Sequence, residues 1–557
     1  MIKKTCYTSI AIVWIFFNYF IGLTCAQELA QAASPGPGLQ SVKTEVNPQV
    51  DLMIIEGNKL LAKGDFELAL PVWLKAIKED KENSNINFKL GLCYLNSYEK
   101  QAKALPYLIN SVKDLTDHYN FADKLEKKAP YDAIYFLAEA YQANNQPAAA
   151  FKHYLIYKDR FKGSPPINVD KKIREAMNAR DMVNTPLNVK YTNLGESVNT
   201  GYSESNPVVA LDNSILFFSS RRLRQDGSNK DVFDKSTGMH TEDIYFSQNA
   251  GGNNWKKPQL FEHNTNINEA PLCLTTDGKT FFLRREDKGQ NDLFQSDFVN
   301  GIWSAPVKLG SNINTSSNES GMTITPDGNT MYFSSDREGG FGKSDLYKAI
   351  KQPDGKWGKA ENLGAFVNTD GVETVPFMHP NGKKLYFSSN GWYSKGMGGY
   401  DIYFIAQQDD GTWSEPQNIG YPINSTRDDM NFYVAANGMR YCTAISDKFN
   451  NDLYILEEGK YDKNNLKPGT VVELQTEMEV MQIIELEREV EKEVEVTEIV
   501  EVETEVEKKV EVEKEVEVVE IIEVEKDPAF VKAAAEKAKA EAEKAIAEAE
   551  IKKAEAE

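Results

Sequence analysis

Residues 325–350 read TPDGNTMYFSSDREGGFGKSDLYKAI. This stretch holds a turn pair at Asp327 and Gly328, an aromatic pair at Tyr332 and Phe333, and an Asp-Leu-Tyr triplet that begins at Asp345. Asp-Gly pairs favour tight hairpin turns because they accept a positive φ. The stretch therefore predicts short, aromatic-rich β-strands joined by a hairpin turn.

The triplet of aspartate, aliphatic residue and aromatic residue occurs five times, at intervals of about 50 residues, a period typical of repeat architectures. The five copies begin at Asp243, Asp292, Asp345, Asp401 and Asp452. A turn and an aromatic strand precede each copy. A four-stranded unit of this length cannot cover its own edges, whereas radial stacking of such units protects them. We therefore expect an all-β propeller over residues 187–458.

Five copies predict five blades, and the ends of the repeat support that number. The fifth copy lacks the Trp-containing fourth strand that follows the others, so we expect the strand at about Val189 to Leu194 to supply it. A six-bladed ring is the alternative, if the segment near Lys467 to Leu474 forms an irregular extra blade. The five repeated aspartates are expected to fix a strand start or a turn, because a residue needed once in every blade is typical of a structural role.

Residues 50–183 show a helical period with a longer period laid over it. From Gly57 to Ala76, small and large residues occur at the spacing of two packed helices. Gly91 starts a second copy 34 residues after Gly57. The pattern resembles the tetratricopeptide family, in which small residues let two helices cross closely. The resemblance implies a helical solenoid of three repeats, with residues 171–182 as a capping helix. Its inner groove is expected to bind a peptide or helix, with these candidate contact residues: Asn58, Leu92, Tyr135 and Glu139.

Residues 1–26 have the form of a secretory signal peptide, with Lys3 and Lys4 ahead of a short apolar run. Cleavage after Ala26 is the simplest outcome. The alternative is lipidation of Cys25, although Thr24 is unusual before a lipidated cysteine. Residues 27–49 are expected to form a linker. The chain is accordingly predicted to be exported.

Two segments of biased composition follow the propeller. Residues 459–527 form a tract rich in Glu and Val, in which nearly all valines from Val480 to Val524 occupy even positions, a strand period. The tract is either a stiff solvated spacer or an extended chain whose Val face pairs with another strand. Residues 528–557 are Ala/Glu/Lys-rich and predict a helix. The whole sequence thus predicts an α+β multidomain protein: a helical solenoid, a propeller and an acidic low-complexity tail.

Composition excludes some functions and leaves others open. The formal net charge is −21, and most of it lies in residues 471–557. Nucleic acid is not an expected partner, because phosphate binding requires a basic face. The five histidines are dispersed, which predicts no metal site, and no phosphate loop or nucleophile elbow is found, so no cofactor and no enzymatic activity are expected.

The order of signal peptide, tetratricopeptide repeats and a WD40-like propeller resembles Bacteroidota cell-envelope proteins of the OmpA-family kind, which include PorE of the type IX secretion system. The propeller repeats also resemble those of TolB-type proteins. This chain lacks the C-terminal OmpA-like domain of that family, which removes the basis for expecting peptidoglycan binding. The resemblance implies a non-enzymatic scaffold, periplasmic or outer-membrane-associated, whose partners are envelope, outer-membrane or secretion proteins. The alternative is a propeller that binds a carbohydrate or peptide ligand and relays to a partner.

Overall fold

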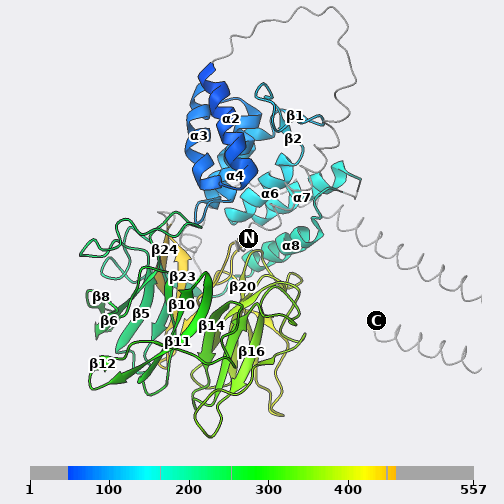
Figure 1. The fold of residues 1–557 in the computed structure, drawn as a ribbon. Coiled ribbons are helices and arrows are strands. Elements are labelled where there is room, and N and C mark those ends of the chain that lie inside the picture. Colours follow the sequence, from blue (N-terminus) through cyan, green and yellow to red (C-terminus); the bar gives the residue numbers. More distant parts are fainter. Residues whose placement is uncertain (1–47, 163–164, 253, 447–449, 460–557) are drawn as a thin grey trace, which may run out of the picture. The chain divides into compact units, whose positions relative to one another are not determined.

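The computed structural model describes residues 48–162, 165–252, 254–446 and 450–459. Within these ranges a helical region, blue to cyan in Figure 1, precedes a region of short strands, green to yellow. The predicted signal peptide, Cys25, the Glu/Val tract after Gly459 and the Ala-rich C-terminal segment lie outside the described residues. No helix within the described ranges has the length and apolar character needed to cross a membrane.

The helical region contains seven α-helices among the described residues. They are α2 (Pro48–Lys63), α3 (Phe66–Glu79), α4 (Ser84–Leu95), α5 (Leu105–Ser111), α6 (Ala133–Ala143), α7 (Pro147–Arg160) and α8 (Asp170–Asn184), with a 3-10 turn η2 (Gln101–Ala104) before α5. A short parallel pair, β1 (Leu115–Thr116) and β2 (Ala129–Pro130), lies between α5 and α6.

Two glycines explain how closely these helices pack. A Cβ added to Gly57 would meet the Trp73 ring at 2.5 Å, and one added to Gly91 would meet Leu108 at 2.5 Å. Both distances are shorter than real contacts allow, so only glycine fits at each crossing. The structure therefore shows the small-against-large packing that the sequence pattern predicts.

The strand region consists of five sheets, each with the strand order of a propeller blade. Blade 1 holds β4 (Glu204–Val209), β5 (Ile215–Ser220), β6 (Asp243–Gly251), β7 (Asn254–Trp255) and β8 (Gln259–Leu260); blade 2 holds β9 (Glu269–Leu274), β10 (Thr280–Asp287), β11 (Gln290–Val299), β12 (Ile302–Trp303) and β13 (Val307–Lys308). Blade 3 holds β14 (Glu319–Ile324), β15 (Thr330–Ser335), β16 (Asp345–Ile350) and β17 (Glu361–Asn362). Blade 4 holds β18 (Glu373–Met378), β19 (Lys384–Ser389), β20 (Asp401–Ala406) and β21 (Gln417–Asn418).

The fifth blade is completed by the first strand of the propeller. It holds β22 (Tyr433–Val434), β23 (Arg440–Ile445) and β24 (Asn451–Glu458), and β3 (Val189–Asn193) pairs antiparallel with β24. The prediction that the N-terminal strand closes the ring is confirmed, as is the five-bladed propeller. The segment near Lys467 to Leu474, on which the six-bladed alternative depended, lies outside the described residues.

Equivalent positions of the repeat form the turn and the core in each blade. The glycine of the predicted turn has a positive φ in blades 2 to 5, for example 67° at Gly278 and 72° at Gly328, and Asn213 has a φ of 59° in blade 1. An aromatic residue of each second strand is fully or almost fully buried: Phe217, Phe281, Phe333, Phe387 and Tyr441. The Phe217 and Phe281 rings stack at 4.5 Å, which joins blade 1 to blade 2.

Candidate ligand site at the propeller axis

A buried carboxylate stands at or near the start of the first strand of every blade. These residues are Glu204, Glu269, Glu319, Glu373 and Asp429. Each accepts hydrogen bonds from the backbone N–H and the hydroxyl of the residue four positions earlier: Thr200, Thr265, Thr315, Thr369 and Ser425. The carboxylates therefore hold the loop that enters each blade.

Arginines complete this arrangement in three blades. Arg222 contacts Glu204 at 3.1 Å and Arg337 contacts Glu319 at 3.1 Å, and Arg285 pairs with Glu269. Burial raises the pKa of these carboxyls, and the arginines partly offset that rise.

Blade 4 has a tryptophan where the arginine would be. Trp392 Nε1 donates to the Val367 carbonyl at 3.0 Å, the same kind of carbonyl that accepts from Arg337 in blade 3. The pKa of the Glu373 carboxyl is raised by burial and lowered by the hydroxyls of Ser389 and Thr369. Sequence reasoning missed this set of carboxylates, although a Thr or Ser four residues ahead of an acidic residue in every repeat is a signal that could have found it.

The five repeated aspartates lie at or near the start of the third strand of each blade. Each one has its own hydrogen-bond partners. Asp243 accepts hydrogen bonds from Arg224 at 2.6 and 2.8 Å. Asp292 accepts one from Lys308 at 2.5 Å, and Asp452 accepts one from Asn193 at 2.9 Å. Asp345 and Asp401 accept backbone N–H groups from the loop before them. Each aspartate is thus bonded within its own blade or to a loop beside it.

The residues predicted to line a peptide groove lie inside the helical packing. Leu92 is fully buried, Asn58 and Tyr135 are each 8% exposed, and Leu92 and Tyr135 belong to one core cluster. Glu139 accepts a hydrogen bond from Tyr154 and lies 3.3 Å from Lys172. The structure therefore brings Tyr135 and Glu139 together through Tyr154, but it offers no peptide-accessible face at Asn58, Leu92 or Tyr135.

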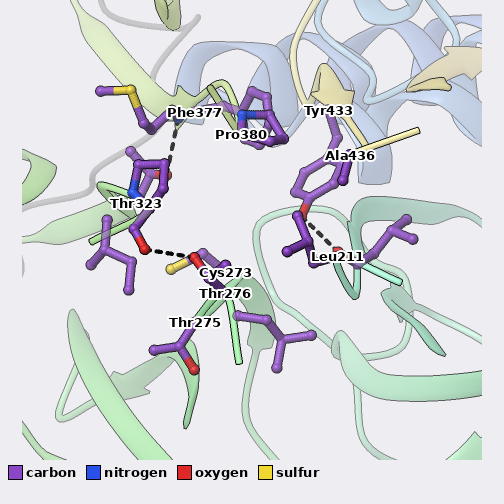
Figure 2. Close-up of a pocket in the computed structure, with 14 residues that line it drawn as sticks. Leu211, Cys273, Thr275, Thr276, Thr323, Phe377, Pro380, Tyr433 and Ala436 are labelled. Atoms are coloured by element: carbon purple, nitrogen blue, oxygen red, sulfur yellow. Dashed lines mark hydrogen bonds between the residues drawn. The ribbon is translucent and has the colours of Figure 1, made fainter. Parts of the chain in front are cut away.

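The opposite ends of the five first strands surround a pocket, shown in Figure 2. All of β4, β9, β14, β18 and β22 contribute residues, so the pocket lies on the propeller axis. Its cavity volume is about 50 Å³, and the pocket opens to solvent. Its lining is Val209, Leu211, Cys273, Leu274, Thr275, Thr276, Thr323, Ile324, Pro326, Phe377, Met378, Pro380, Tyr433 and Ala436.

Hydrogen bonds between blades fix the shape of this pocket. The Tyr433 hydroxyl donates to the Val209 carbonyl at 2.7 Å, which ties blade 5 to blade 1. The Thr323 hydroxyl accepts from the Met378 N–H at 3.0 Å, and the Thr276 hydroxyl donates to the Pro326 carbonyl at 2.8 Å. Figure 2 shows these contacts around the pocket. The site is therefore largely formed without a ligand.

The chemistry of the pocket is neutral. Its 14 lining residues include no Asp, Glu, Lys, Arg or His. The Phe377 and Tyr433 rings lie 4.4 Å apart between centroids, and threonine side chains stand beside them. Burial raises the pKa of the Cys273 thiol, so this side chain is an uncharged thiol at neutral pH. Glycoside hydrolysis commonly uses a pair of carboxyl groups, and none of these 14 lining residues carries one.

Metal ions have no assembled site in the part of the chain described here. Within those ranges no group of three or more His, Cys, Asp or Glu side chains could hold a metal ion. Cys93, Cys273 and Cys442 are all buried free thiols.

No family model and no curated protein sequence matches this chain. Among solved structures it is similar to TolB from Acinetobacter baumannii, at 14% identity and a TM-score of 0.30, over 53% of this chain and 72% of that one. It is also similar to a glycoside hydrolase, at 10% identity and a TM-score of 0.35, over 52% of this chain and 99% of that one. A third is the Penicillium chrysogenum α-L-arabinanase complexed with arabinobiose, at 10% identity and a TM-score of 0.31, over 48% and 98%.

These neighbours correct one expectation. The prediction that the chain is not an enzyme is contradicted, because proteins named as a glycoside hydrolase, an arabinanase and arabinofuranosidases share the propeller. At this low identity the likeness concerns the fold and assigns no reaction. What the comparisons show of this chain is a five-bladed β-propeller that has TolB as a structural neighbour.

Proposed function

We propose that the propeller binds a neutral carbohydrate in the axial pocket formed by β4, β9, β14, β18 and β22. The observation that carries the proposal is the combination of uncharged lining, two adjoining aromatic rings and threonine side chains in one pre-formed site. A sugar presents an apolar ring face and hydroxyl groups, which match Phe377 or Tyr433 and threonine oxygens respectively.

The test is binding by the full chain. A ligand at 100 times its dissociation constant should stabilise the folded protein by about 2.7 kcal/mol. We would follow thermal unfolding with arabinobiose and cellobiose, with glucuronate as a charged sugar and with acetyl-Ala-Pro-Leu-amide as an uncharged peptide. Stabilisation by a neutral sugar is expected. Stabilisation by the peptide alone, by glucuronate alone or by none of them would overturn the proposal.

A blocking variant places the binding at the pocket. Ala436 lies exposed at the rim, so Ala436→Trp should fill the mouth without disturbing the core. Lys383→Trp is the matched control, because Lys383 is exposed in the corresponding turn of blade 4 but does not line the pocket. The sugar-induced stabilisation should disappear in Ala436→Trp and persist in Lys383→Trp.

A second candidate is a protein scaffold, which we propose for the helical region. Its support is the contact between the C-terminal end of α6 and the propeller, where Gln142 Nε2 donates to the Met397 carbonyl at 2.9 Å and the Thr426 hydroxyl donates to the Gln142 carbonyl. Two modules joined in this way can couple a ligand on one to a partner on the other. Crosslinking of the mature protein in its native envelope, followed by mass identification, tests it. Recovery of the protein alone would contradict the scaffold.

Finer assignments remain proposals from the sequence pattern. We propose that the helices are tetratricopeptide repeats and that the chain is an exported envelope protein of the PorE kind. The glycine crossings at Gly57 and Gly91 support the first, and the apolar run after Lys3 and Lys4 supports export. Fractionation of the cells that make the protein would test its periplasmic or outer-membrane location.

A further inference from the structure

The helical region meets blades 4 and 5 through a buried contact. Asn178 of α8 donates to the carbonyls of Tyr393 and Gly396 at 3.2 and 3.0 Å. Ala179 forms an apolar cluster with Met397 and Tyr421, all three almost fully buried. The contact therefore combines buried apolar packing with hydrogen bonds.

Two carboxyl groups face this contact with unsatisfied oxygens. Glu175 of α8 is 3% exposed and Asp401 of β20 is 1% exposed. Glu175 Oε2 and Asp401 Oδ1 have no hydrogen-bond partner. The other Asp401 oxygen accepts the Met397 N–H at 2.8 Å. A buried carboxylate oxygen without a partner is costly, and in a protonated carboxyl that oxygen can instead carry the proton.

The lysines near this contact do not neutralise both Glu175 and Asp401. Lys171 and Lys172 lie 3.7 Å from Glu175, beyond hydrogen-bond distance. Lys172 also contacts Glu139 of α6 at 3.3 Å, and Glu139 accepts from Tyr154 of α7. The other groups near Asp401 are Tyr403 of β20, whose hydroxyl donates to the Trp392 carbonyl, and Asn418 of β21. Glu139 and Glu175 thus share Lys171 and Lys172 on the helix side, and none of the ion pairs of the described residues includes Asp401.

We propose that this contact is a proton-dependent joint, in which Glu175 and Asp401 hold a proton while α8 rests on blade 4 and release it to solvent when the helices separate. The joint does not depend on the proposed carbohydrate site, which lies at the other ends of the first strands. It gives the helical region a means of responding to acidity.

The direction of the effect follows from where the carboxyls titrate. Burial raises the pKa of Asp401 well above its usual 3.8, and the Glu175 charge raises it further. Burial also raises the pKa of Glu175 above 4.5, against the opposing effect of Lys172 and Lys171. A carboxyl with a higher pKa in the joined state holds its proton more tightly there. Joining is therefore strongest in acid and weakens as the pH rises through the raised pKa values.

A third carboxyl, at a separate contact between the helical region and the propeller, acts in the same sense. Glu99, in the loop before η2, accepts hydrogen bonds from the Ser203 hydroxyl at 2.7 and 2.9 Å and from Asn451 Nδ2 at 2.5 Å. Burial raises its pKa from 4.5 to about 7, while Ser203 and Arg221 lower it and Glu242 raises it. This contact spans blade 1 and blade 5, so the joint has two points of titration.

The experiment is amide hydrogen exchange of the full chain at about pH 5.5 and pH 8, corrected for intrinsic rates. Protection of residues 170–184 and 393–401 should fall by about tenfold or more at the higher pH, since one unit of pKa shift is a factor of ten. In Asp401→Asn the fall should be clearly smaller than in the wild type, because the amide cannot ionise while Glu175 and Glu99 still can. Glu175→Gln provides the same test should Asp401→Asn fail to fold.

The control is Asp345→Asn in blade 3. Asp345 occupies the same position as Asp401 and accepts hydrogen bonds from the equivalent groups, Phe341 N–H, Gly342 N–H and Asn362 Nδ2, but it belongs to blade 3 rather than to the blade that α8 contacts. It should lower stability without changing the pH profile of residues 170–184. Equal protection at the two pH values in the wild type, or a wild-type profile in both Asp401→Asn and Glu175→Gln, would overturn the proposal.

Discussion

Asn193 Nδ2 donates a hydrogen bond at 2.9 Å to Asp452 Oδ2, which lies 259 residues later in the chain. The two residues stand where β3 pairs with β24, so the first and last strands of the propeller share one sheet. The hydrogen bond from Tyr433 of β22 to Val209 of β4 adds a second link between blade 5 and blade 1. The stability of the propeller should therefore be sensitive to side chains of β3.

Tyr191→Ala should lower the free energy of unfolding by about 3–5 kcal/mol, as expected for removal of a buried aromatic side chain. Tyr191 is buried in the blade 5 core, and its hydroxyl donates to the Pro422 carbonyl at 2.8 Å. Denaturant unfolding measures the change. Tyr202→Ala is the control, because that ring is 42% exposed. Equal losses in the two variants would show that ring closure does not limit stability.

Glu319→Gln should destabilise the protein more than Glu373→Gln. The first leaves Arg337 without its anion in a buried site, a loss of about 3–5 kcal/mol. Glu373 has hydroxyl and N–H partners and Trp392 in place of an arginine, so its replacement should cost about 1–3 kcal/mol. The comparison needs only denaturant midpoints of the two variants. A larger loss of stability in Glu373→Gln than in Glu319→Gln would mean that the ion pair between Arg337 and Glu319 contributes little to stability.

Lys89→Met should remove a pH dependence from stability. Lys89 is fully buried, its Nζ donates to the Phe121 carbonyl at 3.1 Å, and burial lowers its pKa from 10.5 to about 7. The unfolded chain binds this proton more tightly, so wild-type stability rises as the pH increases from 7 toward 10.5. Relative to Lys89→Met, the gain should be on the order of 2–4 kcal/mol by about pH 9.5.

The measurement for Lys89 is denaturant unfolding of both proteins at several pH values. Lys75→Met serves as the control, since Lys75 is exposed on α3 and should leave the wild-type pH profile unchanged. A constant difference between wild type and Lys89→Met across this range would contradict the prediction.

Gly57→Ala should destabilise the helical region by about 1–3 kcal/mol or more, because the added methyl group meets the Trp73 ring at 2.5 Å and forces repacking. Gly201→Ala is a matched control, since nothing lies within 4 Å of a Cβ at that position. Thermal unfolding followed by circular dichroism at a helix wavelength distinguishes them. Similar unfolding temperatures for the two variants would show that α2 and α3 can separate without penalty.

Local patterns in the sequence were enough to predict the propeller. Turn pairs such as Asp327-Gly328 fix hairpins within a few residues, and five copies of one unit count the blades. The missing fourth strand after Asp452 also indicates where β3 must pair. These features repeat at a fixed spacing, so one copy can be checked against another.

The sites depend on contacts that no local pattern contains. Tyr135 and Leu92 have the helical spacing of groove residues, but neighbouring helices cover them. The axial pocket combines one or two residues from each of five distant strands, and its neutral lining is visible only when those strands meet. Glu175 and Asp401 belong to different modules, so neither repeat predicts that both are buried where α8 meets blade 4.

Ring closure by β3 also sets the order in which the molecule can fold. Helices α2 to α8 pack mainly against near neighbours in the chain, so they can form while the ribosome is still making the strands. Blade 5 cannot be completed until β24 has been synthesised, because its partner β3 was made about 260 residues earlier. A nascent chain that stops before Asn451 would carry an unpaired β3 edge, and that edge is a target for chaperones and a starting point for aggregation.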